Sequence, residues 1–264
     1  MYSMPAVALF DVRDWVIVVT GSAVDITNPL ASILAQTGAH VYVCQPFLSD
    51  NDVPGDLEYP GQTFINMDES NKMSIANAAR IVESRENHIN LLINVNSESS
   101  SIGRRTSWDS FFNKQQPHFL DSASQQTHEV EDWDRVFGTN ISSSYFIASA
   151  FASLLRRGSE SYGCGCVINV SRPGKLPSNA LGGYTLPPTL GTSLGRPSAS
   201  DTALQQLSTL LSTELNQSVT RRESRVRINT VVLRQIAVTS CAVAQSVVSC
   251  AANSFIHGAV ISLE

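Results

Sequence analysis

Short runs of apolar and β-branched residues recur along the chain, and segments with helical spacing separate them. The first run, Trp15–Thr20 (WVIVVT), shows no alternation of polar and apolar residues, which is typical of a strand buried on both faces. Serial strand–helix units of this kind form parallel sheets with helices on both faces. The pattern therefore predicts one α/β domain over residues 1–264, doubly wound around a seven-stranded parallel sheet.

The same periodicities predict where the elements lie. We expect strands at Trp15–Thr20, His40–Cys44, Thr63–Met67, Ile89–Val95, Cys166–Ser171, Val226–Leu233 and Ala259–Leu263. We expect helices at Pro29–Gln36, Asn71–Arg85, Val130–Arg157 and Ser198–Leu215. The polar stretch 97–127 and the Gly/Pro-rich stretch 173–197 are too irregular for core elements, so both are expected to be long loops.

Composition narrows the class of partner. The formal charge of -5 argues against nucleic acid or an anionic membrane, because both attract basic surfaces. The chain has no apolar run near the ~20 residues of a membrane span, and its first ten residues lack the basic start of a signal peptide. Cys164-Gly165-Cys166 has no second Cys/His pair at ligand spacing, so we expect buried reduced thiols and no metal. These features predict a cytoplasmic protein whose partner is a small molecule.

Six segments, taken in order and spacing, resemble the short-chain dehydrogenase/reductase family over nearly the whole chain. They are Thr20–Thr27 (TGSAVDIT), Met67-Asp68, Leu92–Ser97 (LINVNS), Glu131–Asn140 (EDWDRVFGTN), Val167–Ser171 (VINVS) and Phe255–Gly258 (FIHG). The resemblance implies a Rossmann-type domain with a dinucleotide at the carboxyl ends of the strands. It also implies a homodimer or homotetramer formed through the helices at 130–157 and 198–215.

The resemblance further implies roles for individual residues. The cofactor-binding set is Gly21, Ser22, Ile26, Gln45, Asp68, Asn94 and Ile236. Gln45-Pro46 ends the second strand without an acid that would repel a ribose phosphate, which favours NADP(H). Asn140 matches the family's catalytic asparagine, and Ser171 precedes the position of its catalytic serine.

The sequence departs from the family at several functional positions. Asp25 and Thr27 replace two glycines of the phosphate-binding turn, so loss of dinucleotide binding stays open. The catalytic serine becomes Arg172, and the YxxxK motif becomes Pro197–Asp201. Tyr184 lies thirteen residues after Ser171, a normal separation for the family, but a proline stands four residues after it where a lysine is needed.

Charged residues flank the lost tyrosine and offer a substitute chemistry. Arg172, Arg196 and Asp201 can bind an anion, polarise a carbonyl or, for the carboxylate, exchange a proton; equally, they can be solvated or paired with neighbours. The segment 171–175 (SRPGK) and Arg196 resemble features of the fungal reductase/Diels–Alderases of indole alkaloid biosynthesis, although that branch has an acid where Arg172 stands.

Three functions follow in order of preference. The first is an atypical enzyme of specialised metabolism that performs NADP(H)-linked reduction of an imine or iminium, or a cyclisation or isomerisation, on an alkaloid-like substrate. Neither chemistry needs a tyrosine–lysine pair, because an iminium carbon is already activated and a cycloaddition needs chiefly a shaped, dry pocket. The second is a non-catalytic binding or scaffold subunit, and the third is an ordinary carbonyl reductase that uses Tyr184.

Overall fold

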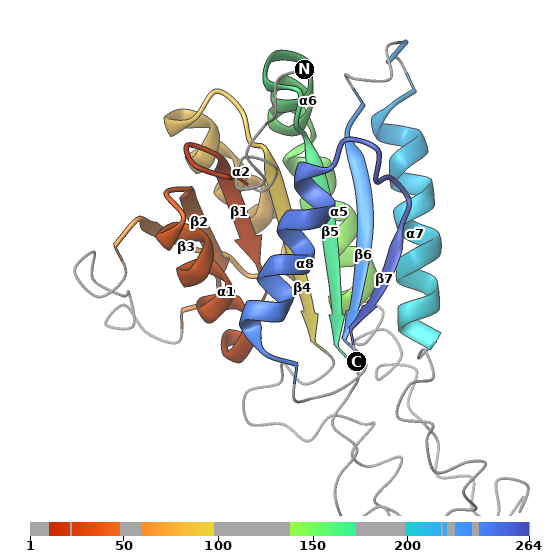
Figure 1. The fold of residues 1–264 in the computed structure, drawn as a ribbon, viewed down its shortest axis with the longest axis horizontal. Coiled ribbons are helices and arrows are strands. Elements are labelled where there is room, and N and C mark those ends of the chain that lie inside the picture. Colours follow the sequence, from red (N-terminus) through yellow and green to blue (C-terminus); the bar gives the residue numbers. More distant parts are fainter. Residues whose placement is uncertain are drawn as a thin grey trace, which may run out of the picture.

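Seven parallel strands form one sheet in the order β3-β2-β1-β4-β5-β6-β7 (Figure 1). The computed structural model describes residues 11–21, 23–47, 60–97, 138–172, 199–217, 219–220, 225–233 and 238–263, with the backbone alone at 97, 139–140, 172 and 199–201. The strands are β1 (Val16–Thr20), β2 (His40–Gln45), β3 (Gln62–Asn66), β4 (Leu91–Ser97), β5 (Cys166–Arg172), β6 (Arg227–Leu233) and β7 (Val260–Leu263). The predicted fold class is confirmed.

Helices cover both faces of this sheet. Their bounds are α1 (Val24–Gln36), α2 (Lys72–Arg85), the π-helix η3 (Gly138–Ser142), α5 (Ser143–Ala150), α6 (Ala152–Tyr162), α7 (Ala199–Leu215) and α8 (Ser240–Ala252). One buried cluster packs α1 and α8 against the sheet, and the other packs α2, α5, α6 and α7 against the opposite face. Figure 1 shows α1 and α8 together in front of the sheet. The strand order reverses between β1 and β4, which places the ligand-binding crevice of such sheets at their carboxyl ends.

The predicted start of the first helix at Pro29 is wrong, since α1 begins at Val24 and contains Pro29. The N–H groups of Ile26 and Thr27 both donate to the Ala23 carbonyl, so the first turn forms without the proline. Proline lacks an N–H and therefore leaves one carbonyl of that turn without a helical partner. The helix tolerates this loss near its start, and proline is a poor marker of the first helical position here.

The single long helix predicted over 130–157 is also wrong. Within the described residues, the π-helix η3 leads into α5, and Phe151 separates α5 from α6. The Phe151 side chain is fully buried, and its backbone leaves the helical region at φ -91° and ψ 3°. Helix α6 then ends at Gly163, whose positive φ of 67° is the usual glycine stop.

Helix α8 has no counterpart in the sequence-based prediction. Its sequence is rich in valine, serine and cysteine, which are weak helix formers. Two signals nevertheless mark it: Thr239 caps the helix by accepting from the Ala242 N–H at 3.3 Å, and Val243, Val247 and Cys250 share its buried face. The other predicted bounds differ from the structure by only one or two residues.

A buried arginine closes the carboxyl end of α8. The Arg227 guanidinium donates at 2.9 Å to the carbonyls of Cys250 and Asn253, and it also bonds the Ala251 carbonyl. Arg227 is 7% exposed, and no acidic side chain pairs with it among the described residues. The partial negative charge of a helix carboxyl terminus replaces the carboxylate that a buried cation normally needs.

The exposure of each cysteine depends on whether its position faces the core or the solvent. Four of the five are buried, as predicted, whereas Cys241 is exposed because it lies on the solvent face of α8. Burial raises the pKa of Cys44 and of Cys166 to about 12, so both thiols are neutral and unreactive. No helix among the described residues combines the length and apolarity that a membrane crossing requires.

Candidate active site at the carboxyl edge of the sheet

Gly21 forms the turn between β1 and α1 at the crevice. Its φ is +129°, and a Cβ built there would lie 2.2 Å from the carbonyl oxygen of Val95 on β4. Only glycine allows β1 and β4 to approach this closely while the chain turns. The sequence-predicted first glycine of the phosphate-binding turn is thus required by the geometry of this crevice.

Thr27 occupies the place of a lost glycine without opening the turn. Its side chain is fully buried, and its hydroxyl donates to the Gly21 carbonyl at 3.3 Å. This hydrogen bond joins the start of α1 to the turn at Gly21. In the family motif, a glycine at the position of Thr27 lets the helix pack closely against that turn. Ile26 beside it is buried in the core cluster, so its side chain serves packing. Asp25 is exposed in the first turn of α1, where the helix would meet a phosphate.

The end of β2 carries a buried amide. Gln45 is 7% exposed, and its Oε1 has no hydrogen-bond partner among the described residues. An unpaired buried acceptor is costly unless a ligand or water completes it, so Gln45 is the strongest local indication of a ligand near this strand. Asp68, beyond β3, is exposed, and its Oδ1 accepts from the N–H and the hydroxyl of Ser70 at 2.9 and 2.6 Å. This arrangement shapes the turn before α2.

A row of buried polar side chains crosses the four central strands. Thr20, Asn94, Asn169 and Thr230 are register partners on adjacent strands. The Thr20 hydroxyl donates to Asn94 Oδ1 at 3.0 Å, and Asn94 Nδ2 donates to Asn169 Oδ1 at 2.9 Å. Asn169 Nδ2 donates to Ser208 Oγ at 2.9 Å, and Ser208 Oγ lies 3.3 Å from Thr230 Oγ1. This polar row joins the turn at Gly21 to helix α7, and only Asn94 had been singled out from the sequence.

A second polar level lies two residues closer to the carboxyl edge. Asn96 is buried, and its amide nitrogen and oxygen lie 3.1 and 3.2 Å from the hydroxyl of Ser144 on α5. Asn96 is the register partner of Ser171, which is 5% exposed. Asn140 lies just before α5 in the π-helix η3, a geometry often found at functional sites. The end of β4 and the start of the α5 region therefore converge with β5 at this edge.

Several sequence-predicted site residues fall partly or wholly outside the described structure. The backbone places Arg172 as the last residue of β5 and Asp201 as the third residue of α7. The side chains of Asn140, Arg172 and Asp201 are not described. Four further predicted residues lie outside the described residues: Ser22, Tyr184, Arg196 and Ile236.

Comparison with known proteins adds structural relatives only. No protein-family model matches the chain, and no curated protein sequence matches it. RhlG of Pseudomonas aeruginosa, solved as an active-site complex with NADP, is 18% identical with a TM-score of 0.67, and the match covers 97% of each chain. An NADH-dependent reductase, A1-R', complexed with NAD, is 18% identical with a TM-score of 0.65 over 97% of each chain.

A short-chain dehydrogenase/reductase variant of Serratia marcescens is 16% identical with a TM-score of 0.61, covering 96% of this chain and 97% of its own. At such low identity these likenesses bear on architecture alone. This chain has the short-chain dehydrogenase/reductase fold. The crevice described above therefore lies at the edge where that fold, like other doubly wound sheets, presents its ligand site.

Proposed function

We propose that this protein is a cytoplasmic oxidoreductase of the short-chain dehydrogenase/reductase type that uses NADP(H) to reduce an imine or iminium. The observation that carries the proposal is the turn at Gly21. Gly21 has a φ of +129°, and a Cβ at this position would lie 2.2 Å from the Val95 carbonyl oxygen, so only glycine fits. The turn therefore keeps the geometry of a dinucleotide-binding turn, although two glycines are missing from the motif. The buried Thr27 hydroxyl donates to the Gly21 carbonyl at 3.3 Å and helps to hold this turn.

The residues present fit a dinucleotide with a ribose phosphate. The glycine turn and the amino-terminal end of α1 would hold the pyrophosphate, and Gln45 would meet the ribose with its unpaired Oε1. Gln45 carries no charge to repel an extra phosphate, which supports NADP(H) over NAD(H). The complex of RhlG with NADP points in the same direction. When bound, the cofactor supplies or accepts hydride.

The choice of an iminium substrate rests on the missing relay. An iminium carbon takes up hydride to give an amine and needs no further proton. A neutral imine reaches the same state by taking one proton from solvent before the hydride arrives, so the phenol and ammonium of YxxxK are dispensable in both cases. Arg172 is the last residue of β5 and Asp201 lies in the first turn of α7, and we propose these two charged residues as substitutes for the missing relay. In the same scaffold, a cyclisation of Diels–Alder type or an isomerisation of an alkaloid-like substrate needs only a closed, shaped pocket.

The test is a cofactor titration followed by a single turnover. NADPH fluorescence or calorimetry should give a saturable complex in the micromolar range, with NADH weaker. The loaded protein, mixed with a cyclic N-alkyl iminium salt, should consume NADPH stoichiometrically, whereas a matched ketone should not react. Absence of any complex with either cofactor at millimolar concentration would sink the proposal, and reaction of the ketone alone would favour the carbonyl reductase.

A second candidate, a non-catalytic binding or scaffold subunit, is favoured by Asp25. This carboxylate stands exposed in the first turn of α1, where a phosphate would have to bind. Like charges at that position weaken anion binding. In either role we propose a homodimer or homotetramer formed through the α5–α6 region and α7, on which Leu210 is 62% exposed.

A further inference from the structure

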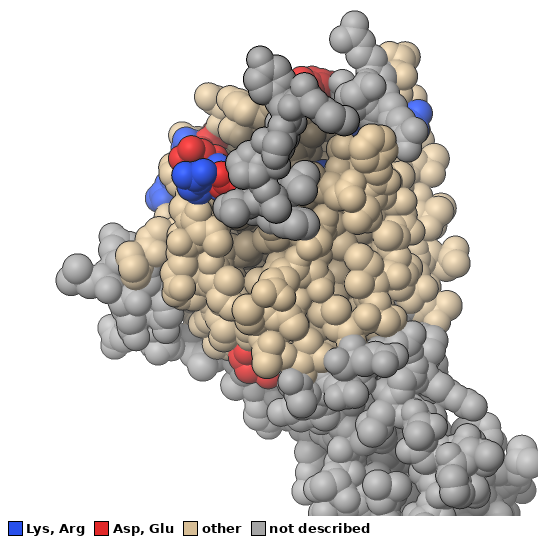
Figure 2. Space-filling view, viewed as in Figure 1, with Lys and Arg blue, Asp and Glu red and all other residues tan. Residues whose placement is uncertain are grey.

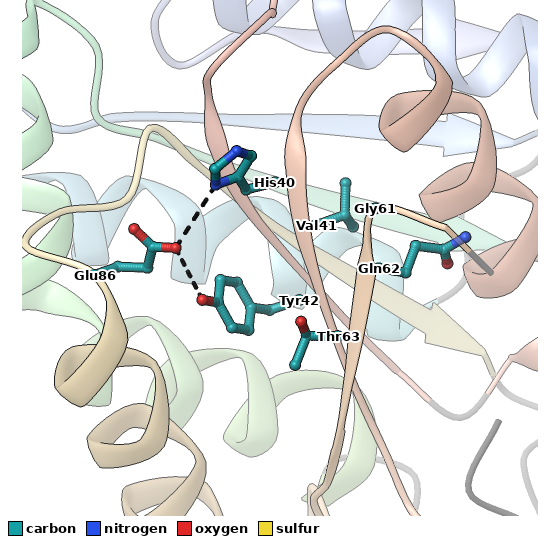
Figure 3. Close-up of a pocket in the computed structure, with 7 residues that line it drawn as sticks. All are labelled: His40, Val41, Tyr42, Gly61, Gln62, Thr63 and Glu86. Carbon is teal, nitrogen blue, oxygen red and sulfur yellow. Dashed lines mark hydrogen bonds and ion pairs between the residues drawn. The ribbon is translucent and has the colours of Figure 1, made fainter. Parts of the chain in front are cut away.

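A separate hollow opens at the opposite edge of the sheet, at the amino ends of β2 and β3 (Figure 3). Its volume is about 370 Å³, and it is lined by His40, Val41, Tyr42, Gly61, Gln62, Thr63 and Glu86. Strand β2 starts in this hollow and ends at Gln45 in the crevice, so roughly 16 Å of strand separates the two places. The hollow is therefore distinct from the candidate active site.

Glu86 contacts two of the other polar side chains that line the hollow. It caps the carboxyl end of α2, and its Oε1 accepts from the Tyr42 hydroxyl at 2.8 Å. The His40 Nδ1 lies 3.9 Å from the same oxygen. Figure 3 shows these three side chains turned toward one another, with Gln62 on the other side of the strands. Burial, together with the hydrogen bond to Glu86, raises the pKa of Tyr42 to about 12, so the phenol is a neutral donor.

The carboxylate of Glu86 has one ion-pair contact among the described residues, with His40 Nδ1 at 3.9 Å. Its side chain is only 20% exposed, and no lysine or arginine pairs with it among the described residues. The neighbouring Arg157 pairs with Glu83 at 2.9 Å instead. Glu86 Oε2 has no hydrogen-bond partner in the described part of the chain, although a carboxylate offers about four acceptor sites. The hollow thus presents a partly desolvated negative charge with an open acceptor.

We propose that this hollow binds a small primary ammonium compound, with Glu86 Oε2 as the acceptor for its N–H groups. A guanidinium fits less well because its bidentate grip needs both carboxylate oxygens, and Tyr42 already occupies Oε1. A metal ion fits less well because no group of three metal-ligating side chains occurs among the described residues. A hollow of about 370 Å³ accommodates an amine with a carbon chain of several atoms.

The probe is 1,4-diaminobutane, titrated into the full chain by calorimetry or amide NMR, with 1-butanol as the neutral control ligand. The diamine should bind saturably with a dissociation constant on the order of 1 mM, as expected for so small a ligand, and 1-butanol should not bind. Glu86→Gln preserves the size of the side chain and an acceptor for Tyr42, yet it should weaken the diamine at least ~tenfold. Glu83→Gln, one turn earlier on the same helix, should change the affinity by less than about twofold.

A second variant guards against a folding defect. Glu86→Asp keeps the charge but withdraws the carboxylate by one methylene, and it should weaken binding about as much as Glu86→Gln. Circular dichroism and thermal melting verify that each variant is folded. Non-saturating titration, or equal weakening by Glu83→Gln, would overturn the proposal by showing unspecific attraction to surface charge. Because the titration contains no dinucleotide, its outcome is independent of the proposed reductase activity.

Discussion

Asn169 connects the two halves of the polar row, so its replacement by leucine should break the link between the Gly21 turn and α7. The side chain is fully buried, with one hydrogen bond to Asn94 and one to Ser208, both 2.9 Å long. Leucine has a similar shape, which keeps the cavity term small. We therefore expect the loss to come from hydrogen bonding rather than from packing.

The magnitude follows from the groups left behind. Two hydrogen bonds disappear at about 1 kcal/mol each, and the Asn94 amide N–H that loses its acceptor costs roughly 1–3 kcal/mol more. Ser208 keeps a bond to the Leu204 carbonyl at 2.8 Å, so it is not stranded. The added apolar surface returns about 1–2 kcal/mol. The net expectation is a loss of about 1–4 kcal/mol from the free energy of unfolding, a large share of the usual 5–15 kcal/mol.

Urea unfolding followed by circular dichroism measures this loss. A double-mutant cycle with Ser208→Ala should show a coupling energy of about 1 kcal/mol, because the two side chains share one bond. Thr209→Ala, at the exposed neighbouring position on α7, should change stability by less than about 0.5 kcal/mol. If Asn169→Leu costs less than about 0.5 kcal/mol, or is strictly additive with Ser208→Ala, the polar row is not a connected network.

Three further predictions concern charge and assembly. Arg227→Met should cost roughly 3–5 kcal/mol in urea unfolding, because buried carbonyls of α8 lose their donor, whereas Arg225→Met at the exposed neighbouring position should be close to neutral. Asp25→Asn should tighten NADPH by about threefold to fivefold in a fluorescence titration, and Asp14→Asn at the opposite edge should not. Light scattering should give a dimer or tetramer; a monomer of 28.6 kDa at micromolar concentration would contradict the proposed interface.

The sheet could be predicted because almost every one of its strands is a short, local run of mostly apolar residues in the sequence. Strands such as Val16–Thr20 are buried on both faces, and a continuous apolar run is the direct consequence. Helices were harder to delimit where local rules conflict. Proline is usually a start signal, but in α1 the Ala23 carbonyl already holds the first turn, and in α8 weak helix formers hid a buried stripe. Tertiary packing overrode local propensity in both cases.

The sequence predicted the candidate site only at positions where the type of a single residue reveals its role. Gly21 is such a position, because the approach of Val95 tolerates no side chain. The polar row depends on residues more than seventy positions apart, such as Thr20 and Asn94, and becomes visible only when the register aligns them. The sequence did offer one signal for the polar row: each of the four buried apolar strands contains a Thr or Asn at the matching position. The Tyr42–Glu86 contact joins elements forty-four residues apart and left no pattern to find.

Three substitutions distinguish the proposed reductase from an ordinary carbonyl reductase, at Tyr184, Arg196 and Asp201. If the site works without a phenol relay, Tyr184→Phe should keep turnover within about tenfold, less than ~1.4 kcal/mol of barrier. Arg196→Ala or Asp201→Ala should cost far more, since charge aimed at a reacting centre in a closed pocket is worth about 2.7–4 kcal/mol. Asp201 also lies in the first turn of α7, where an acid stabilises a helix, so thermal melting must accompany the kinetics. A folded Asp201→Ala protein with normal turnover, beside an inactive Tyr184→Phe protein, would make Tyr184 the proton donor and return the chain to carbonyl reduction.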